Sequence, residues 1–123
     1  MHIIENEEMP KSNGHYSQCI AHNGLLYLSG QLAIDSKTGQ IPEGIAAQTL
    51  QALQNVEAIL LAAGTGRDKV LQMRLYISDI HLWEQVNEVY SSFFADHKPV
   101  RAVIPTRELH YGSLIEIEAT AVL

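Results

Sequence analysis

Hydrophobic and polar residues alternate along two short stretches near the N-terminus, which is the pattern of β-strands with one buried face. The stretches run from Tyr16 to Ile20 and from Leu25 to Ser29, with His22-Asn23-Gly24 between them. An Asn-Gly pair favours a tight turn, because both residues adopt positive φ readily. The pattern therefore predicts a β-hairpin. The residues before it, 1–12, are mostly polar and are expected to lie on the surface as an extended arm.

The spacing of apolar residues then changes to three or four, which is the period of a helix with one buried face. The first such run extends from Ile45 to Leu60 and ends before Gly64, a residue suited to the left-handed conformation that caps many helices. The second run, from Leu82 to Phe93, follows Ser78-Asp79, which can cap its N-terminus. Two amphipathic helices are predicted.

Alternation returns between the two helices, where Leu71, Met73, Leu75 and Ile77 are expected on one face of a strand. After the second helix come two arms rich in β-branched residues, 99–105 and 113–121, which also read as strands. Gly112 provides a flexible link between the arms. We expect the two arms to approach one another, so that Arg101 on the first and Glu116 on the second lie close together.

The predicted order is strand, strand, helix, strand, helix, strand, strand. Such an order indicates an α+β fold in which two helices cover one face of a mixed sheet. No repeat or linker divides residues 1–123, so a single domain is predicted. The other face then carries Arg74, Tyr76, Glu116 and Glu118. It either faces water or packs against other copies of the chain, which would create clefts for small ligands between subunits.

The charge balance limits the partners that the chain can bind. The 123 residues include 14 Asp and Glu against 8 Lys and Arg, a formal net charge of -6, and no basic run. Nucleic acid requires clustered positive charge, so a nucleic-acid partner is not expected. Residues 1–8 are acidic where a signal peptide would be basic, and no apolar run is long enough to cross a membrane. With Cys19 as the single cysteine, we expect a soluble, cytoplasmic protein without a disulfide.

Arg101 is the candidate anchor for a ligand carboxylate. Its planar guanidinium matches a carboxylate through two hydrogen bonds and stays charged at physiological pH. The alternative role, a surface or interface salt bridge, is the more common one for a lone arginine.

Glu116 is the candidate proton-transfer group, because it stands between Ile115 and Ile117 in a strand whose neighbours favour burial. A partly desolvated carboxyl binds protons more tightly and can exchange them with water near neutral pH. Glu118 lies two residues further along on the same face and fits a solvated carboxylate equally well. Sequence alone leaves both roles open for Glu116.

Other chemically active residues carry weaker signals. Tyr16 is a candidate pocket residue, although most tyrosines at the start of a strand are packing residues. Gly30 would let another group approach the backbone closely. The six histidines lack metal-ligand spacing, so no metal is predicted. Cys19 has no adjacent basic group and is expected to be a buried, inert thiol. Trp83 and Phe94 are expected to be packing residues.

Short motifs occur in order along nearly the whole chain. They are Gly14-His15-Tyr16-Ser17-Gln18, Ser29-Gly30-Gln31, Gly39, Gln48, Leu53-Gln54-Asn55-Val56, Ala62-Ala63-Gly64, Val86-Asn87-Glu88-Val89-Tyr90, Pro99-Val100-Arg101 and Ile115-Glu116-Ile117-Glu118-Ala119. Taken together, they resemble the RidA or YjgF-like proteins, a family of reactive intermediate deaminases once labelled translation-inhibitor endoribonucleases.

The resemblance implies a chorismate-mutase-like fold and a homotrimer with clefts between subunits. It also implies hydrolysis of enamines and imines, such as 2-aminoacrylate and 2-iminopropanoate, to a 2-oxo acid and ammonia without a cofactor. By motif, Arg101 would grip the substrate carboxylate and Glu116 would activate the attacking water. Tyr16 would line the pocket from a neighbouring chain, and the backbone at Gly30 would contact the nitrogen end of the substrate.

The chain departs from the family pattern in three places. His15 replaces the usual proline before Tyr16, Ala102-Val103 replaces Ser-Cys after the arginine, and residues 106–111 lack the common Leu-Pro. The second change makes a polar pocket wall apolar and therefore bears on which substrate is accepted. Arg107, in the third segment, is a rival contact for an anion.

Three functions are consistent with these residues. The first is hydrolytic deamination of 2-imino acids, which rests on the presence of both Arg101 and Glu116. The second is a non-catalytic, trimeric protein that binds a small carboxylate in the same clefts. The third is ribonuclease activity, which the acidic charge disfavours.

Overall fold

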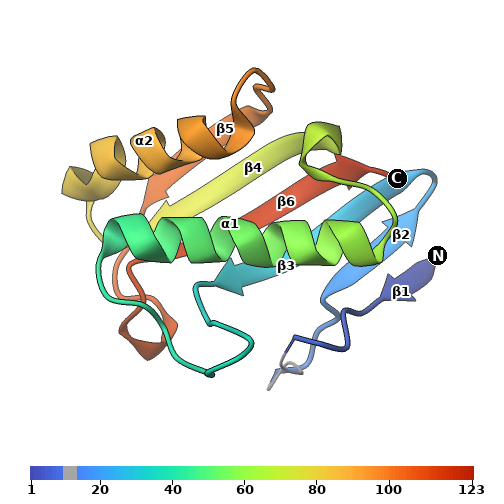
Figure 1. Cartoon of the computed structure of the whole chain (residues 1–123), viewed down its shortest axis with the longest axis horizontal. Helices are drawn as coiled ribbons and strands as arrows, with labels where there is room; N and C mark the ends of the chain where they lie inside the picture. The colour runs from blue at the N-terminus through green and yellow to red at the C-terminus, as the bar shows by residue number, and fades with distance from the viewer. Residues whose placement is uncertain (10–13) are drawn as a thin grey trace.

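A computed structural model describes residues 1–9 and 14–123. Within this part of the chain, six strands form one mixed sheet in the order β1-β2-β3-β6-β4-β5. The strands are β1 (His2–Ile4), β2 (Cys19–His22), β3 (Leu25–Leu32), β4 (Val70–Ile77), β5 (Val100–Pro105) and β6 (Ile115–Val122). Helices α1 (Ile45–Ala62) and α2 (Trp83–Phe94) lie on the same face of the sheet (Figure 1). The predicted α+β class and the two-helix layer are confirmed.

The core lies between this face of the sheet and the two helices. Met73, Leu75 and Ile77 of β4 have no exposed surface, and neither do Leu53 of α1 and Val86 of α2. Burial of each such side chain contributes about 1.5–3 kcal/mol to folding before the entropy cost. The two periods read from the sequence therefore identify these five core positions correctly.

Local turns also agree with the sequence. Asn23 and Gly24 have φ of 51° and 78° and join β2 to β3 in a hairpin. Gly64, after α1, has φ of 90°. The Asp79 side chain accepts a hydrogen bond from the backbone N–H of His81, in the short 3-10 turn that leads into α2.

Two boundaries differ from the prediction. β2 begins at Cys19 rather than at Tyr16, and the first residues contribute a strand, β1, that pairs with β2. β1 is only three residues long and exposed at an edge, so it leaves no periodic signal. The remainder of the predicted N-terminal arm includes residues 10–13, which lie outside the described part of the chain.

The buried face of β4 also begins at a different residue from the one predicted. The register of β4 against β6 shifts between Val70 and Gln72, so Val70 is buried and Leu71 is 45% exposed. A bulge adds one residue and moves the side chains before it to the other face. The prediction that Leu71 faces the core is therefore wrong, whereas Met73 to Ile77 follow the expected alternation.

The expected approach of the last two strands is wrong. β4 lies between them, because β5 pairs parallel to β4 and β6 pairs antiparallel to both β4 and β3. The parallel pair is connected through α2, as parallel strands require a long crossover. A flexible link at Gly112 allows a hairpin but does not require one.

Two buried polar side chains of α1 fix the strand ends near the candidate residues. The Asn55 side chain donates hydrogen bonds to the carbonyls of Leu32 and Ile34, at 2.9 and 3.0 Å. Gln48 accepts a hydrogen bond from the backbone N–H of Leu114 at 2.9 Å, just before β6. Because these groups are buried, their hydrogen bonds are costly to lose, and they hold β3 and β6 in register against the helix. No helix of the described residues is both long and apolar enough to cross a membrane.

Candidate functional site

Glu116 lies against the backbone of Gly30, on the face of the sheet that the helices leave uncovered. Glu116 pairs with Leu32 of β3 and with Tyr76 of β4. A Cβ atom added to Gly30 would lie 3.0 Å from the Cδ and Oε2 atoms of Glu116. The β3 register shifts between Leu28 and Gln31, so Gly30 stands in an irregular part of the strand. The glycine therefore provides the space that the carboxyl occupies.

The surroundings of Glu116 favour its protonated form. Partial burial raises the pKa of the Glu116 carboxyl, the negative charge of Glu118 raises it further, and His110 lowers it. No side chain or backbone group of the described residues donates a hydrogen bond to Glu116. A carboxyl in this state can accept a proton from water at higher pH than an ordinary glutamate.

Glu118 is paired, although it shares this face with Glu116. The Tyr76 hydroxyl donates a hydrogen bond to Glu118, and Nη1 of Arg74 lies 3.9 Å from its carboxylate. The hydrogen bond to Glu118 is the main cause that raises the pKa of Tyr76. Glu118 is thus satisfied by its neighbours, which separates the two glutamates that the sequence left equivalent.

Tyr16 precedes β2. The two residues that follow it form hydrogen bonds with Ser29, the neighbour of Gly30 in β3. The Ser29 hydroxyl donates to the carbonyl of Ser17 at 2.6 Å, and the Ser29 N–H donates to the carbonyl of Gln18 at 2.9 Å. Tyr16 itself is 55% exposed, and a Cβ on Gly14 would lie 2.8 Å from its ring. The Tyr16 ring is therefore available on the surface, close in sequence to the groups that hold the Gly30 segment.

Arg101 is held against α2 by three side chains. Its Nη1 donates a hydrogen bond to Oδ1 of Asn87 at 2.8 Å. Its guanidinium carbon lies 4.8 Å from the ring centroid of Tyr90 and 5.5 Å from that of Trp83. Cation–π contacts of this kind orient a guanidinium without using its N–H donors. Four of the five donors remain for other partners, and β5 presents them at the edge of the sheet.

The Tyr90 hydroxyl is buried without a hydrogen-bond partner among the described residues. Burial raises the pKa of Tyr90 to about 12, an effect that the positive charge of Arg101 opposes. The hydroxyl consequently stays protonated at physiological pH. Tyr90 also packs against Phe94, with ring centroids 4.8 Å apart, so the support under Arg101 continues into the core.

Arg101 and Glu116 lie on opposite faces of the sheet. Arg101 pairs with Met73, whose side chain is in the core, whereas Glu116 pairs with Tyr76 on the uncovered face. Side chains an odd number of residues apart on one strand point to opposite faces, so Met73 and Tyr76 mark the two faces of β4. Within one copy of the chain, the sheet separates the guanidinium from the carboxyl.

The remaining candidate residues are a cysteine and two aromatic residues that the sequence predicts to be buried or packed. Cys19 is 1% exposed, and its burial raises the thiol pKa, as expected for an unreactive cysteine. Phe94 is buried as predicted, but Trp83 is 37% exposed and contacts Arg101 rather than the core. Among the described residues, no group of three His, Cys, Asp or Glu side chains is placed to hold a metal ion.

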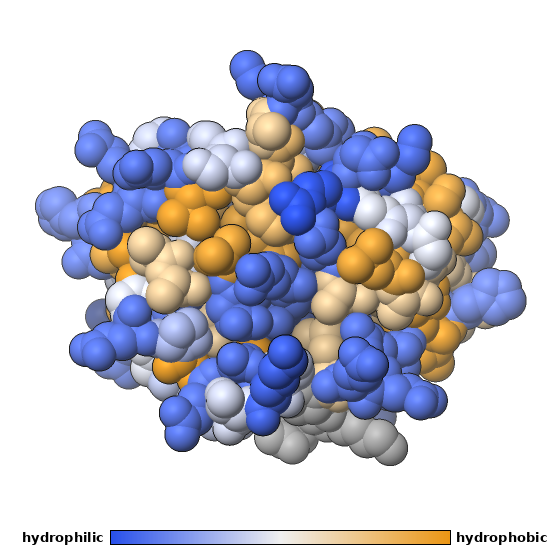
Figure 2. All heavy atoms as spheres, in the orientation of Figure 1, coloured by the Kyte–Doolittle hydropathy of each residue, from blue (hydrophilic) through white to orange (hydrophobic). Residues whose placement is uncertain are grey.

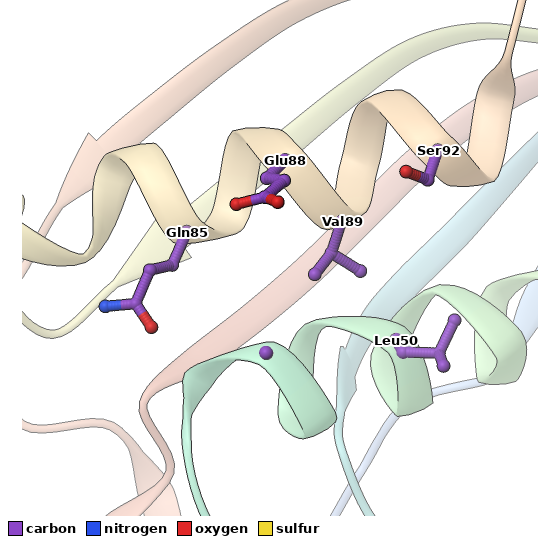
Figure 3. Close-up of a pocket in the computed structure, with 6 residues that line it drawn as sticks. Leu50, Gln85, Glu88, Val89 and Ser92 are labelled. Atoms are coloured by element: carbon purple, nitrogen blue, oxygen red, sulfur yellow. The ribbon is translucent and has the colours of Figure 1, made fainter.

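A shallow groove of about 370 Å³ lies between the outer sides of the two helices. Leu50 of α1 and Gln85, Glu88, Val89 and Ser92 of α2 line it (Figure 3). In the space-filling view of this helical face, apolar surface appears in separate patches among polar side chains (Figure 2). None of the predicted site residues belongs to the groove.

Comparison with known proteins identifies the family. The family model described as "Endoribonuclease L-PSP" matches residues 6–123. The chain belongs to the RidA/YjgF/L-PSP family. A "RutC family protein" of Pyrococcus horikoshii is 42% identical over 97% of this chain and 95% of its own. A Rattus norvegicus relative named "2-iminobutanoate/2-iminopropanoate deaminase" is 38% identical over 98% of this chain and 88% of its own.

A solved structure of the family has the same fold. The crystal structure of Escherichia coli TdcF with bound serine superposes with a TM-score of 0.95 at 33% identity, covering 100% of this chain and 99% of that one. The family resemblance read from the motifs is therefore confirmed.

The sequence did not reveal how Arg101 is supported. Asn87 and Tyr90 belong to a motif that carries the family resemblance, but the motif alone indicates no role for either side chain, and Trp83 fits a packing residue by its sequence position. Residues 83, 87 and 90 are spaced to form one stripe of a helix. That stripe, facing a strand with a lone arginine, is the signal that would have identified the cluster.

Substitution Gly30→Ala tests the close contact with Glu116. The new methyl group would displace a flexible carboxyl rather than backbone, so the chain should fold with an unchanged circular dichroism spectrum. The carboxyl must move by a few tenths of an ångström to make room, which should lower the proposed deaminase activity by less than the roughly 100-fold that a 1 Å misplacement can cost. Gly39→Ala, at an exposed turn with positive φ, tests backbone strain alone and should retain activity. Equal activity of Gly30→Ala and wild type would show that the contact has no role in function.

Substitution Glu118→Gln tests the electrostatic coupling to Glu116. Removal of the neighbouring negative charge should lower the pKa of Glu116, so its ionised carboxylate would persist to lower pH. The acid limb of the pH–kcat/KM profile should therefore move to lower pH. His110→Asn removes the opposing influence and should move the same limb to higher pH. Shifts in the same direction for both variants would contradict the opposite effects of Glu118 and His110 on the pKa of Glu116.

Proposed function

We propose that this chain hydrolyses 2-imino acids, such as 2-iminobutanoate and 2-iminopropanoate, to 2-oxo acids and ammonia. The observation that carries the proposal is the contrast between Glu116, a partly buried carboxyl without a described hydrogen-bond donor, and the paired Glu118 beside it. Deaminases of the family, such as the rat relative 38% identical to this chain, support the choice of reaction.

The proposed active site forms between copies of the chain. Because the sheet separates Arg101 from Glu116, one ligand can reach both only if they come from different copies. The helix-side edge at β5 of one copy would face the uncovered sheet face of the next. A head-to-tail contact of this kind forms a ring when its rotation closes, and we propose that it closes after three copies, as the family resemblance implies.

Arg101 would bind the substrate carboxylate. Asn87 occupies one N–H group, and the Tyr90 and Trp83 rings restrict the orientation of the guanidinium. The remaining donors can form the two parallel hydrogen bonds that a carboxylate accepts. The reacting carbon is bonded directly to this carboxylate, so fixing one end of the substrate also orients the other.

Glu116 would transfer the protons of the reaction. Water attacks the carbon of the protonated imine while Glu116 takes one of the water protons, so a neutral carbinolamine forms. Glu116 then returns this proton to nitrogen, and the C–N bond breaks as the carbinolamine hydroxyl gives its proton to the Glu116 carboxylate and becomes the carbonyl. Glu116 finally releases that proton to solvent or to the departing ammonia. The products are a 2-oxo acid and ammonia. Tyr16 would line the pocket, and the backbone at Gly30 would contact the nitrogen end.

A non-catalytic role as a binder of small carboxylates is the second candidate. The observation that favours it is the serine bound by Escherichia coli TdcF, which is an amino acid and not an imine. In that role Arg101 would bind the ligand in the same way, whereas Glu116 would have no proton to transfer.

The test is release of ammonia and 2-oxo acid when an amino acid oxidase generates the imine in the presence of the protein. Wild type should exceed the rate in buffer. Glu116→Gln should reduce kcat by about 100- to 10,000-fold, the usual contribution of a general base. Arg101→Lys, which keeps the charge but not the planar fork, should lose most of kcat/KM.

Arg107→Ala decides between the two candidate anion contacts. Arg107 is exposed in the segment before β6, whereas Arg101 is held by α2. Loss of activity in Arg107→Ala together with a fully active Arg101→Ala would overturn the role of Arg101.

A wild-type rate equal to that in buffer, with 2-oxo acid binding retained, would favour the non-catalytic function.

A further inference from the structure

The two aromatic rings that flank Arg101 differ in what they offer a ligand. Tyr90 is 7% exposed and supports the guanidinium from the core side. Trp83, the first residue of α2, is 37% exposed and lies 5.5 Å from the guanidinium carbon. A ligand bound to the free donors of Arg101 would therefore meet the Trp83 indole rather than the Tyr90 ring.

Val103 makes the neighbouring position along β5 apolar as well. Arg101 pairs with Met73 and Val103 pairs with Leu75, so both side chains point to the helical side of the sheet. Val103 is partly buried and packs against the core. The side of β5 that carries Arg101 is thus lined by the isopropyl group of Val103 and, beyond the guanidinium, by the largely apolar indole of Trp83.

We propose that Trp83 and Val103 form a specificity wall, and that this chain selects 2-oxo and 2-imino acids with bulky, branched apolar substituents over those with a methyl group. The inference rests on the proposed role of Arg101 in binding the carboxylate. The substituent of such a ligand is bonded to the carbon next to the carboxylate, so a carboxylate on Arg101 would bring it to the side of β5 that carries Val103 and Trp83. Each methylene buried there should tighten binding by about fourfold.

The chain contains a single tryptophan, which makes its fluorescence a direct probe of the wall. Titration of the full-length protein with 4-methyl-2-oxopentanoate should change the emission of Trp83. Calorimetry should give a dissociation constant about tenfold to sixtyfold lower for 4-methyl-2-oxopentanoate than for pyruvate, the upper figure corresponding to full burial of the three added carbons. These products bind without turnover, so the result does not depend on catalysis.

Substitutions separate a specificity wall from a mere support for Arg101. Trp83→Ala should reduce the preference for 4-methyl-2-oxopentanoate by about tenfold while changing pyruvate affinity less than about threefold. Val103→Ser should weaken the same preference, and Trp83→Phe should retain most of it. Ile80→Ala, an exposed apolar residue just before α2, is the matched control and should bind both ligands as wild type does.

Three results would overturn the proposal: equal affinity for the two 2-oxo acids, an equal loss of both affinities in Trp83→Ala, or a preference that survives both wall substitutions. Failure of the proposed function is recognised separately. Selective binding without imine hydrolysis would support the specificity wall and contradict the proposed deaminase function. Imine hydrolysis without selectivity would support the deaminase function and contradict the specificity wall.

Discussion

The two-residue period of the central strand β4 determines on which face of the sheet each candidate site residue lies. Its side chains divide the sheet into a face covered by helices and a face without them. Arg101 belongs to the first face through its pairing with Met73, and Glu116 belongs to the second through Tyr76. A site that uses both groups must therefore be assembled from more than one chain, and under the proposed function each copy would contribute two half-sites, one around Arg101 and one around Glu116.

Each half-site combines a charged group with features that have little value for stability alone. Glu116 is partly buried without a described donor, and Gly30 gives up a side chain to accommodate it. Tyr90 keeps a buried hydroxyl without a described partner beneath Arg101. An unsatisfied buried polar group such as the Tyr90 hydroxyl costs about 1–3 kcal/mol, so its position beneath Arg101 fits a role in function better than a role in stability. The paired Glu118 next to Glu116 illustrates the ordinary alternative.

Much of the fold followed from local patterns, and the errors have physical causes. Apolar periodicity located both helices and the hairpin at Asn23-Gly24, because these elements depend on nearby residues. The placement of β4 between β5 and β6 depends on long-range pairing, which a turn near Gly112 does not encode. The sequence also identified Arg101 and Glu116 as candidates, but not the sheet between them, because the face of Arg101 is set by its partner strand.

The most direct test of a shared active site mixes two inactive proteins. Arg101→Ala and Glu116→Ala chains, unfolded together and refolded in equal amounts, would form mixed assemblies in which some sites receive both intact residues from different copies. The account predicts about a quarter of wild-type deaminase activity in the mixture, since one interface in four combines an intact Arg101 with an intact Glu116. Activity no greater than that of the separate variants, in assemblies shown to have exchanged chains, would contradict it.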